Sequence, residues 1–241
     1  MNIYSKTDIG VRRNTNQDYT YYSAQQIGNL PNVLIVADGM GGHKAGEVAS
    51  EQAVNAVLQS IRENEKQDKI SIIEEAIDIA NCRVLELSGK DEMYKGMGTT
   101  IVVATLERNS LYVANVGDSR LYLIDDDIKQ ITRDHSLVQE MISRGEIDKE
   151  SAKTHLKKNV ITRAVGVEQK VTADFFEVEV REGTKILLCT DGLTNMVDDS
   201  MIKSIIDGCA DSGIEQAVNM LVDEANRNGG LDNIAVILAE V

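Results

Sequence analysis

The 241-residue sequence predicts an α+β fold of mainly antiparallel strands and amphipathic helices. Two aliphatic stretches, 34–37 and 185–189, are too short for most helices, and each leads into Asp-Gly and then a helical pattern. A group of three strand-like segments joined by short loops predicts an antiparallel meander. Together these patterns indicate sheets whose ends carry acidic residues next to helices.

Composition predicts one compact domain spanning residues 1–241. The chain is 42% hydrophobic, contains a single proline and has no linker-like tract. A net charge of −14 argues against nucleic acid as a partner, because phosphate backbones are usually met by a basic face. The start lacks a signal-peptide pattern and no apolar run reaches membrane-spanning length, so we expect a cytoplasmic protein away from membranes. The lack of an appended domain favours a monomer.

The three cysteines lie far apart in apolar settings, at Cys82, Cys189 and Cys209. This spacing predicts reduced thiols in the core rather than disulfides or a zinc site. A catalytic cysteine is the alternative.

The N-terminal segments 4–10 and 18–23 have the patterns of strands around a polar turn that contains Arg13. An arginine in such a loop is usually just solvated, so Arg13 by itself indicates no function. A phosphate group nearby would change that interpretation.

The stretch LIVADGMGGHKAGE at 34–47 organises the chain, because it delivers Asp38 and then breaks into glycines. Asp-Gly after a strand is commonly a hairpin turn, which requires a second strand at once. Apolar residues instead recur at helical spacing through 48–61. The glycines therefore connect a strand to a helix, and a functional role for Asp38 at the sheet end is favoured.

A second helix is expected to begin with a capping box formed by Ser71 and Glu74. Strand-like segments then follow at 101–107, 111–116 and 120–124. Asp118 falls in the short connection between the last two. A hairpin turn explains an aspartate there, so spacing alone favours a structural role for Asp118.

Residues 133–166 are polar and poor in β-branched runs, with one short amphipathic helix through Leu137, Met141 and Ile142. We expect an insertion that lies over a sheet edge and shapes access to a site. Beyond it come strands at 173–180 and 185–189.

The second aliphatic stretch ends at Asp191, and helices are expected through 201–209 and 214–225. The final strand is expected at 234–238, which puts Asp232 at its beginning.

Asp38, Asp191 and Asp232 are thus positions that an antiparallel arrangement can bring to one end of a sheet. Two carboxylates about 4 Å apart repel by about 4 kcal/mol at an effective dielectric constant near 20, so such a cluster needs protons or cations. Oxygen ligands without His or Cys favour Mg²⁺ or Mn²⁺ over zinc. A two-metal centre that activates water for attack on phosphorus is the obvious use.

Eight sequence blocks carry a family resemblance: GVRRNTNQD at 10–18, VADGMGGH at 36–43, GTT at 98–100, ANVGDSR at 114–120, DHS at 134–136, NVITRAVG at 159–166, TDG at 190–192 and GLDN at 230–233. In this order they resemble the metal-dependent protein phosphatases of the PPM family, also called PP2C, in their compact bacterial form. The resemblance covers essentially the whole chain. It implies a four-layer α-β-β-α sandwich, two antiparallel sheets flanked by helices, with 133–166 as a small flap.

The resemblance also implies a binuclear Mn²⁺ or Mg²⁺ centre. Asp38 would bridge the two ions and the Gly39 carbonyl would bind one of them. Asp191 and Asp232 would hold the other, and Asp18 would act mainly through water.

A third, weaker ion of the bacterial enzymes would be shared by Asp118 and Asp191, which moves the interpretation of Asp118 towards function. The implied reaction is hydrolysis of phosphoserine and phosphothreonine in proteins by metal-activated water, without a phosphoenzyme. Arg13 would bind the phosphate oxygens through its planar fork.

One departure from the family concerns the general acid. Animal members place a proposed acid-donating His two residues after the bridging Asp, where this chain has Met40. We hypothesise that His43, or a water on the metal, protonates the leaving oxygen. His155 in the flap is a candidate substrate contact, although a lone loop His is more often surface. It precedes Leu156, where related chains often have Pro.

Two other hypotheses compete with an active phosphatase. One is a catalytically inactive PP2C-fold module that binds phosphoproteins or regulates them. The other is a metal-stabilised interaction domain without turnover. The expected partners of the active enzyme are phosphorylated proteins, including a Ser/Thr kinase or its substrates.

Overall fold

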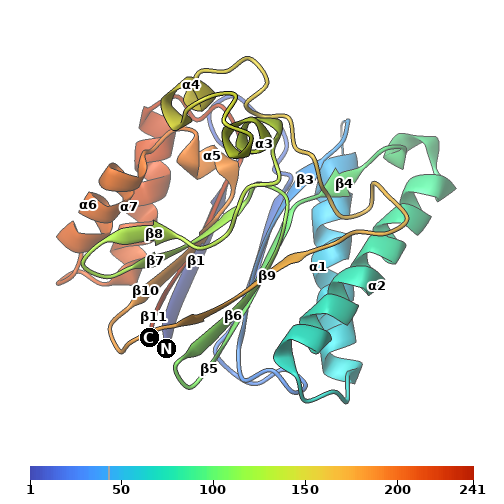
Figure 1. The fold of residues 1–241 in the computed structure, drawn as a ribbon, viewed down its shortest axis with the longest axis horizontal. Coiled ribbons are helices and arrows are strands. Elements are labelled where there is room, and N and C mark those ends of the chain that lie inside the picture. The colour runs from blue at the N-terminus through green and yellow to red at the C-terminus, as the bar shows by residue number, and fades with distance from the viewer. Residues whose placement is uncertain (43) are drawn as a thin grey trace.

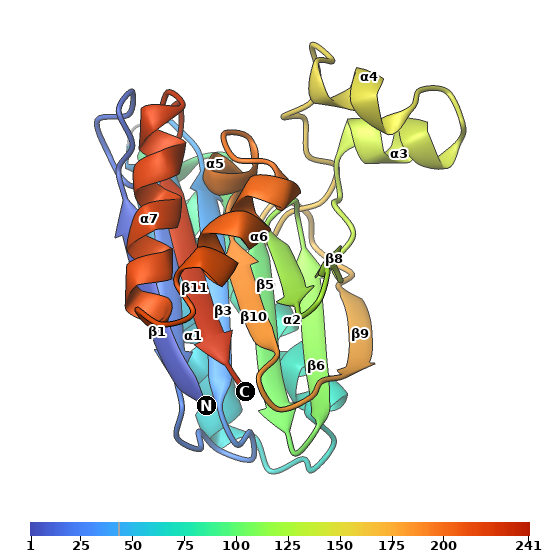
Figure 2. The ribbon, with the colours of Figure 1, turned by 90° about the vertical axis from the view of Figure 1, so that its left-hand side faces the viewer.

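The computed structural model describes residues 1–42 and 44–241, and it consists of two antiparallel β-sheets packed face to face between two layers of helices (Figures 1 and 2). The α-β-β-α arrangement implied by the resemblance is therefore confirmed. His43, the expected general acid, lies outside the described residues.

The first sheet has the order β1-β11-β10-β7-β8. Its strands are β1 (Asn2–Asp8), β11 (Ile234–Glu240), β10 (Lys185–Cys189), β7 (Arg120–Ile124) and β8 (Ile128–Gln130). The second sheet has the order β2-β3-β5-β6-β9, with β4 paired to β3. Its strands are β2 (Asp18–Ser23), β3 (Val33–Met40), β4 (Gly98–Thr99), β5 (Ile101–Glu107), β6 (Ser110–Val116) and β9 (Asp174–Glu179).

Helices cover the outer face of each sheet. On the second sheet lie α1 (Ala45–Glu63) and α2 (Lys69–Lys90), and on the first lie α5 (Asp191–Thr194), α6 (Asp199–Gly208) and α7 (Ile214–Arg227). The 3₁₀ turn η1 (Glu92–Tyr94) follows α2, while α3 (Leu137–Ser143) and α4 (Lys149–Lys153) lie in the flap.

Alternation along the strands builds the core in three layers. In β3, Ile35 and Ala37 face the helices, whereas Leu34 and Val36 face the other sheet. Ile237 of β11 belongs to the same intersheet layer. Both faces of the central strands are buried, which explains their continuous apolar runs.

The expected meander is wrong at its third strand. β5 and β6 pair as predicted, but β7 pairs with β10 and β8 in the first sheet. Residues 117–119 therefore carry the chain from one sheet to the other and do not form a hairpin turn. A hairpin turn therefore does not explain the aspartate at position 118.

Two smaller expectations are also wrong. The cap of α2 is Asp68, whose carboxylate accepts a hydrogen bond from the backbone N–H of Ser71 at 2.8 Å, so Ser71 and Glu74 form no capping box. Cys82 is exposed on α2, while Cys189 and Cys209 are buried as predicted. The short β8 and α4 were not expected from the sequence.

The segment 133–166 projects from the sandwich at α3 and α4 (Figure 2), yet both of its ends are anchored. The backbone N–H of His135 donates to the Gly117 carbonyl at 2.9 Å, and Val165 exchanges backbone hydrogen bonds with Thr99 at 2.9 and 3.0 Å. The two ends of this segment are thus tied to the sandwich beside residues 117 and 99.

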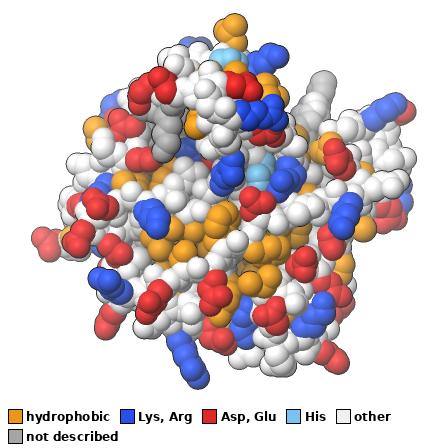
Figure 3. Space-filling view, viewed as in Figure 1, with side chains coloured by type: hydrophobic (Ala, Val, Ile, Leu, Met, Phe, Trp, Pro, Cys, Tyr) orange, Lys and Arg blue, Asp and Glu red, His pale blue; other side chains and the backbone are white. Residues whose placement is uncertain are grey.

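Between the sheet edges, apolar side chains gather at the centre of the face seen in Figure 3, with charged side chains around them. Leu123 and Phe176 are partly buried side chains that pack against the core between the two sheets. None of the helices in the described part of the chain is both long and apolar enough to cross a membrane.

Candidate metal centre

Asp18 and Asp38 lie opposite each other on the neighbouring strands β2 and β3. Directly opposed residues project from the same face of a sheet with Cβ atoms about 5 Å apart. β3 continues for two residues beyond Asp38, to Met40, so Asp38 lies within the strand and not at its end. The pairing places two carboxylates side by side where the sheet ends.

The backbone of Asp38 is fixed by two threonines that sequence reasoning did not single out individually. Its N–H donates to Thr100 Oγ1 at 2.9 Å, and its carbonyl accepts from Thr99 Oγ1 and from the Thr100 N–H, both at 2.9 Å. These bonds fix the Asp38 backbone from which the carboxylate projects.

The first sheet contributes the other acidic residues from the same end. Asp191 begins α5 directly after β10, and its Oδ2 accepts a hydrogen bond from Asn195 Nδ2 at 2.9 Å. Asp232 precedes β11, and its Oδ2 forms an ion pair with Arg13 Nη2 at 2.7 Å. Because β10 and β11 are antiparallel neighbours, the end of one lies beside the start of the other.

Asp118 reaches the cluster from the crossing between the sheets. Its side chain is buried, and it is repelled by Asp191 and by Asp134. The crossing is held by Asn115, whose Nδ2 donates to the Arg133 carbonyl at 2.9 Å.

Electrostatics show that the five carboxylates interact. Burial, and then repulsion from Asp191 and Asp232, raises the pKa of Asp18 to about 8. Burial, followed by repulsion from neighbouring carboxylates, raises the pKa of Asp118 to about 7 and that of Asp191 to about 6. The pKa of Asp38 is raised well above its usual range, first by burial and then by the other four carboxylates, Asp18 foremost. These carboxylates are therefore clustered in a buried region, where water does little to stabilise their negative charge.

The unpaired oxygen atoms fit a cation. Oδ1 of Asp18 and Oδ1 of Asp191 are buried and accept no hydrogen bond. A buried acceptor without a donor is costly, and an ion removes both this cost and the mutual repulsion. Within the described residues, no three acidic, His or Cys side chains are already spaced as ligands of one ion, so binding would draw carboxylates together.

Gly39 is required by a close backbone approach. A Cβ at this position would lie 1.9 Å from the Gly46 carbonyl oxygen and 2.8 Å from that of Gln17. The start of α1 and the turn before β2 can therefore pack directly against β3, next to Asp38.

The structure thus brings together most of the predicted site residues: Arg13, Asp18, Asp38, Gly39, Asp118, Asp191 and Asp232. His155 is placed in the flap, in the turn after α4. Its backbone N–H donates to the Ala152 carbonyl at 3.2 Å, and its Nδ1 accepts from the Lys157 N–H at 3.1 Å. These local contacts give it no place in the carboxylate cluster.

Sequence reasoning missed two residues that position the cluster. Thr190 Oγ1 donates to Asp18 Oδ2 at 2.7 Å. Asn233 Nδ2 donates to the carbonyls of Ile9 and Thr15, both at 2.9 Å, and its Oδ1 accepts from the Gln17 N–H, also at 2.9 Å. Both residues stand next to a predicted ligand in the sequence, which was the available signal.

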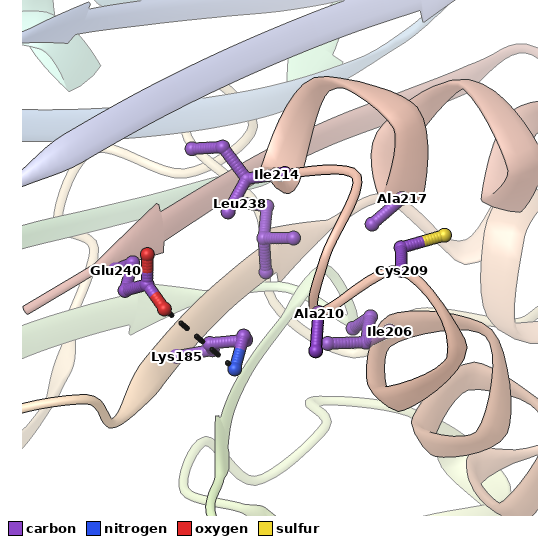
Figure 4. A pocket seen from close by; sticks show the side chains of 9 residues that line it. Lys185, Ile206, Cys209, Ala210, Ile214, Ala217, Leu238 and Glu240 are labelled. Carbon is purple, nitrogen blue, oxygen red and sulfur yellow. Dashed lines mark ion pairs between the residues drawn. The ribbon is translucent and has the colours of Figure 1, made fainter.

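A small cavity of about 20 Å³ lies elsewhere, between α6, α7 and the first sheet (Figure 4). Its polar lining includes Lys185 and Glu240, whose Nζ and Oε1 are 3.8 Å apart. Lys185 begins β10 and Glu240 ends β11, so this cavity is at the opposite end of the strands from Asp191 and Asp232. It is separate from the carboxylate cluster.

Comparison with known proteins shows which proteins share this sequence and fold. The family model described as protein phosphatase 2C matches residues 11–223. The chain is 39% identical over 246 residues to the protein phosphatase PhpP of Streptococcus pneumoniae serotype 2, covering 100% of this chain and 98% of that protein. It superposes on the serine/threonine phosphatase of S. agalactiae with a TM-score of 0.92 and 34% identity, over 100% of this chain and 99% of the other.

A third match is the catalytic domain of the serine threonine protein phosphatase PstP in complex with two manganese ions. Its TM-score is 0.87 at 30% identity, over 99% of this chain and 97% of the other.

The fold and the acidic cluster define a metal-dependent phosphatase, and the chain belongs to the protein phosphatase 2C family. The expectation of an active enzyme is confirmed, and it is favoured over the inactive module of the same fold. The family resemblance stated from the sequence is confirmed as well.

Proposed function

We propose that this protein hydrolyses phosphoserine and phosphothreonine esters of proteins at a centre holding two Mn²⁺ or Mg²⁺ ions, with a third, weaker ion beside them. The observation that carries the proposal is the pairing of Asp18 with Asp38, next to buried carboxylate oxygens that accept no hydrogen bond. When bound, divalent ions would acidify a water molecule and offset negative charge on the phosphate.

In this proposal Asp38 and the Gly39 carbonyl would hold one ion, and Asp191 and Asp232 would hold the second together with Asp38. Asp18 would act mainly through water. Asp38 lies within β3 and Asp191 begins α5, which supports their assignments because ligands set on regular elements are held more firmly than ligands on loops. Asp232 lies in the loop before β11, where its ion pair with Arg13 restrains it.

Asp118 is proposed to hold the third ion together with Asp191. Repulsion from Asp191 is the largest charge effect on Asp118 after burial, which supports their closeness. The location of Asp118 at the sheet crossing makes this ligand set dependent on the packing of both sheets.

Arg13 is proposed to bind the phosphate oxygens of the substrate. Its side chain is 48% exposed and is anchored on one side by Asp232, so the remaining N–H donors of the guanidinium are accessible to a ligand. A planar guanidinium can bind two phosphate oxygens at once, which fixes the direction of the scissile bond.

The donor of the proton to the leaving oxygen is proposed to be His43 or a water, and His155 is kept as a candidate contact for the protein substrate. His43→Ala should slow turnover of a phosphothreonine peptide more than that of p-nitrophenyl phosphate, whose leaving group needs no proton. If the rate of His43→Ala, divided by the rate of the unmodified protein, is the same for both substrates, His43 is excluded as the proton donor.

We further propose that residues 1–241 act as one catalytic domain with 133–166 as a flap, and that the substrates include a Ser/Thr kinase or its targets. Relatives named as protein phosphatases support protein substrates. The cytoplasmic location and monomeric state expected from the sequence stay predictions.

The direct test is hydrolysis of a phosphothreonine peptide with Mn²⁺ and with excess chelator. Activity should require the metal and should fall at least about 10²-fold in Asp38→Asn and Asp191→Asn, which remove charge but keep shape. Asp78→Asn, at an exposed position on α2, is the matched control. Full activity in chelator would overturn the proposal, and stabilisation by metal without turnover would support the interaction domain instead.

A further inference from the structure

Two exposed loops beside the carboxylate cluster are joined through their backbones. The N–H groups of Val11 and Arg12 both donate to the Gly230 carbonyl, at 2.8 and 3.1 Å. Asp8 adds a second tie, because its Oδ1 accepts from the Gly10 N–H at 2.8 Å and from Asn226 Nδ2 at 3.1 Å. The loop 9–13 and the loop 229–232 therefore form one surface.

That surface carries two exposed aliphatic side chains, Val11 and Leu231, which we call the apolar pair. Val11 is 63% exposed and Leu231 is 55% exposed. A Cβ on Gly230 would lie 2.7 Å from Val11 Cγ2, and a Cβ on Gly229 would lie 3.7 Å from Leu231 Cδ2. Val11 thus lies beside Gly230 and Leu231 beside the adjacent Gly229.

Gly230 makes this arrangement possible. Its φ of +51° is in the left-handed region, and a Cβ would also lie 2.6 Å from Asn226 Oδ1 and 2.8 Å from the Val11 nitrogen. A larger residue would separate the loops and with them the apolar pair.

The apolar pair is continuous with the proposed phosphate site. Arg13 follows Val11 by two residues, and Asp232 follows Leu231 directly. The ion pair between Arg13 and Asp232, 2.7 Å long, joins the same two loops. A molecule whose phosphate contacts Arg13 therefore has an aliphatic surface within a few residues of it, on a scaffold already ordered before binding.

We propose that Val11 and Leu231 bind an apolar side chain that flanks the phosphorylated residue of a protein substrate. The inference rests on the proposed role of Arg13 at the phosphate. Burial of a Leu or Val side chain contributes about 1.5–3 kcal/mol when complete, and these two have half or more of their surface to bury. The pair thereby makes the enzyme prefer phosphoresidues in apolar sequence contexts.

The test uses two phosphothreonine peptides that differ only at the residues on both sides of the phosphothreonine, Leu in one and Ser in the other. The ratio of their kcat/KM values is measured for the unmodified protein and for Val11→Ser and Leu231→Ser. We expect the unmodified protein to prefer the Leu peptide. In each variant the ratio of kcat/KM values should fall about fivefold, mainly through a higher KM for the Leu peptide.

Ile79→Ser is the matched control, because Ile79 is 45% exposed on α2, outside these two loops. It should leave the ratio unchanged. Equal kcat/KM values for the two peptides in the unmodified protein, or an unchanged ratio in both loop variants, would overturn the inference. Absence of turnover on either peptide would instead count against the proposed function, so the two failures are distinguishable.

Discussion

Thr190 and Asp18 form a hydrogen bond that joins the two sheets at the carboxylate cluster. Thr190 Oγ1 donates to Asp18 Oδ2 at 2.7 Å and accepts from the Ala235 N–H at 2.9 Å. Asp18 begins β2 in one sheet, while Thr190 follows β10 in the other. A buried hydroxyl therefore links the two sheets at the point where the metal ligands are proposed to meet.

Thr190→Val should destabilise the protein, because it keeps the shape of the side chain and removes the only hydroxyl donor described for Asp18 Oδ2. Loss of a hydrogen bond to a buried acceptor costs about 1–3 kcal/mol. Urea denaturation of the metal-free protein measures the change, and Thr190→Ser should recover most of it. A valine variant as stable as the unmodified protein would show that this bond contributes nothing.

The metal-free protein should become less stable as the pH rises from about 4 to about 8. The pKa of Asp18, Asp118 and Asp191 is about 8, 7 and 6 in the folded state, against 3.8 for an ordinary Asp. In this window the folded state binds more protons than the unfolded state, so the free energy of unfolding decreases with pH.

Thermal denaturation at several pH values measures this trend. Saturating Mn²⁺ should remove it, since an ion stabilises the deprotonated carboxylates. Asp38→Asn should reduce it, because the substitution removes a carboxyl group whose own pKa is raised well above its usual range by burial and by the neighbouring carboxylates. Stability that rises with pH in the absence of metal would contradict the raised pKa values.

Two glycine substitutions should have opposite effects on stability. A Cβ at Gly192 would lie 1.8 Å from the Asn233 carbonyl oxygen, so Gly192→Ala must displace the start of α5 together with Asp191. We expect a loss of about 3 kcal/mol or more and a weaker affinity for Mn²⁺. Gly89→Ala, on α2 with open space around it, should instead stabilise the protein by up to about 1 kcal/mol. Chemical denaturation of both variants checks the pair.

The three thiols should react in two classes. Cys82 is exposed, whereas Cys189 and Cys209 are buried, and burial raises the pKa of Cys189 to about 12. A thiol reagent such as Ellman's reagent should titrate one group rapidly in the folded protein and three in denaturant. Cys82→Ser should abolish the rapid phase, and fast labelling of Cys189 in the folded protein would contradict the burial described here.

Local sequence patterns predicted the individual elements well. The strands at 18–23, 101–107, 120–124 and 185–189 have the bounds expected for them. The aliphatic runs at 101–107 and 185–189 signal burial on both faces, and burial of this kind is encoded locally.

Strand pairing was harder to predict, because it depends on contacts between distant segments. A short polar connection such as 117–119 fits a hairpin turn as well as a crossing between sheets, and only the packing of β7 against β10 distinguishes them. Asp118 was for this reason assigned a structural role by spacing, although the structure places it among the carboxylates.

The cap of α2 and the exposure of Cys82 were missed for a related reason. Asp68, Ser71 and Glu74 all have side chains that can cap a helix, and the choice between them depends on where the first turn begins. Cys82 lies one residue away from the buried stripe of α2, where a small rotation of the helix changes exposure. The convergence of Asp191 and Asp232, by contrast, followed from the end of β10 and the start of β11, which local patterns locate. Asp38 joins them although β3 continues for two residues beyond it.

The position of β11 between β1 and β10 has a consequence for biosynthesis. β1 has its neighbour in the first sheet only when the chain has been translated through residue 240, because it pairs with β11, which follows the other strands of that sheet along the chain. Before that point, a nascent chain has no β11 next to β10, even if its other strands have already paired. Enzymatic activity should therefore arise only once β11 has emerged, and a ribosome stalled before that point would display a catalytically silent chain.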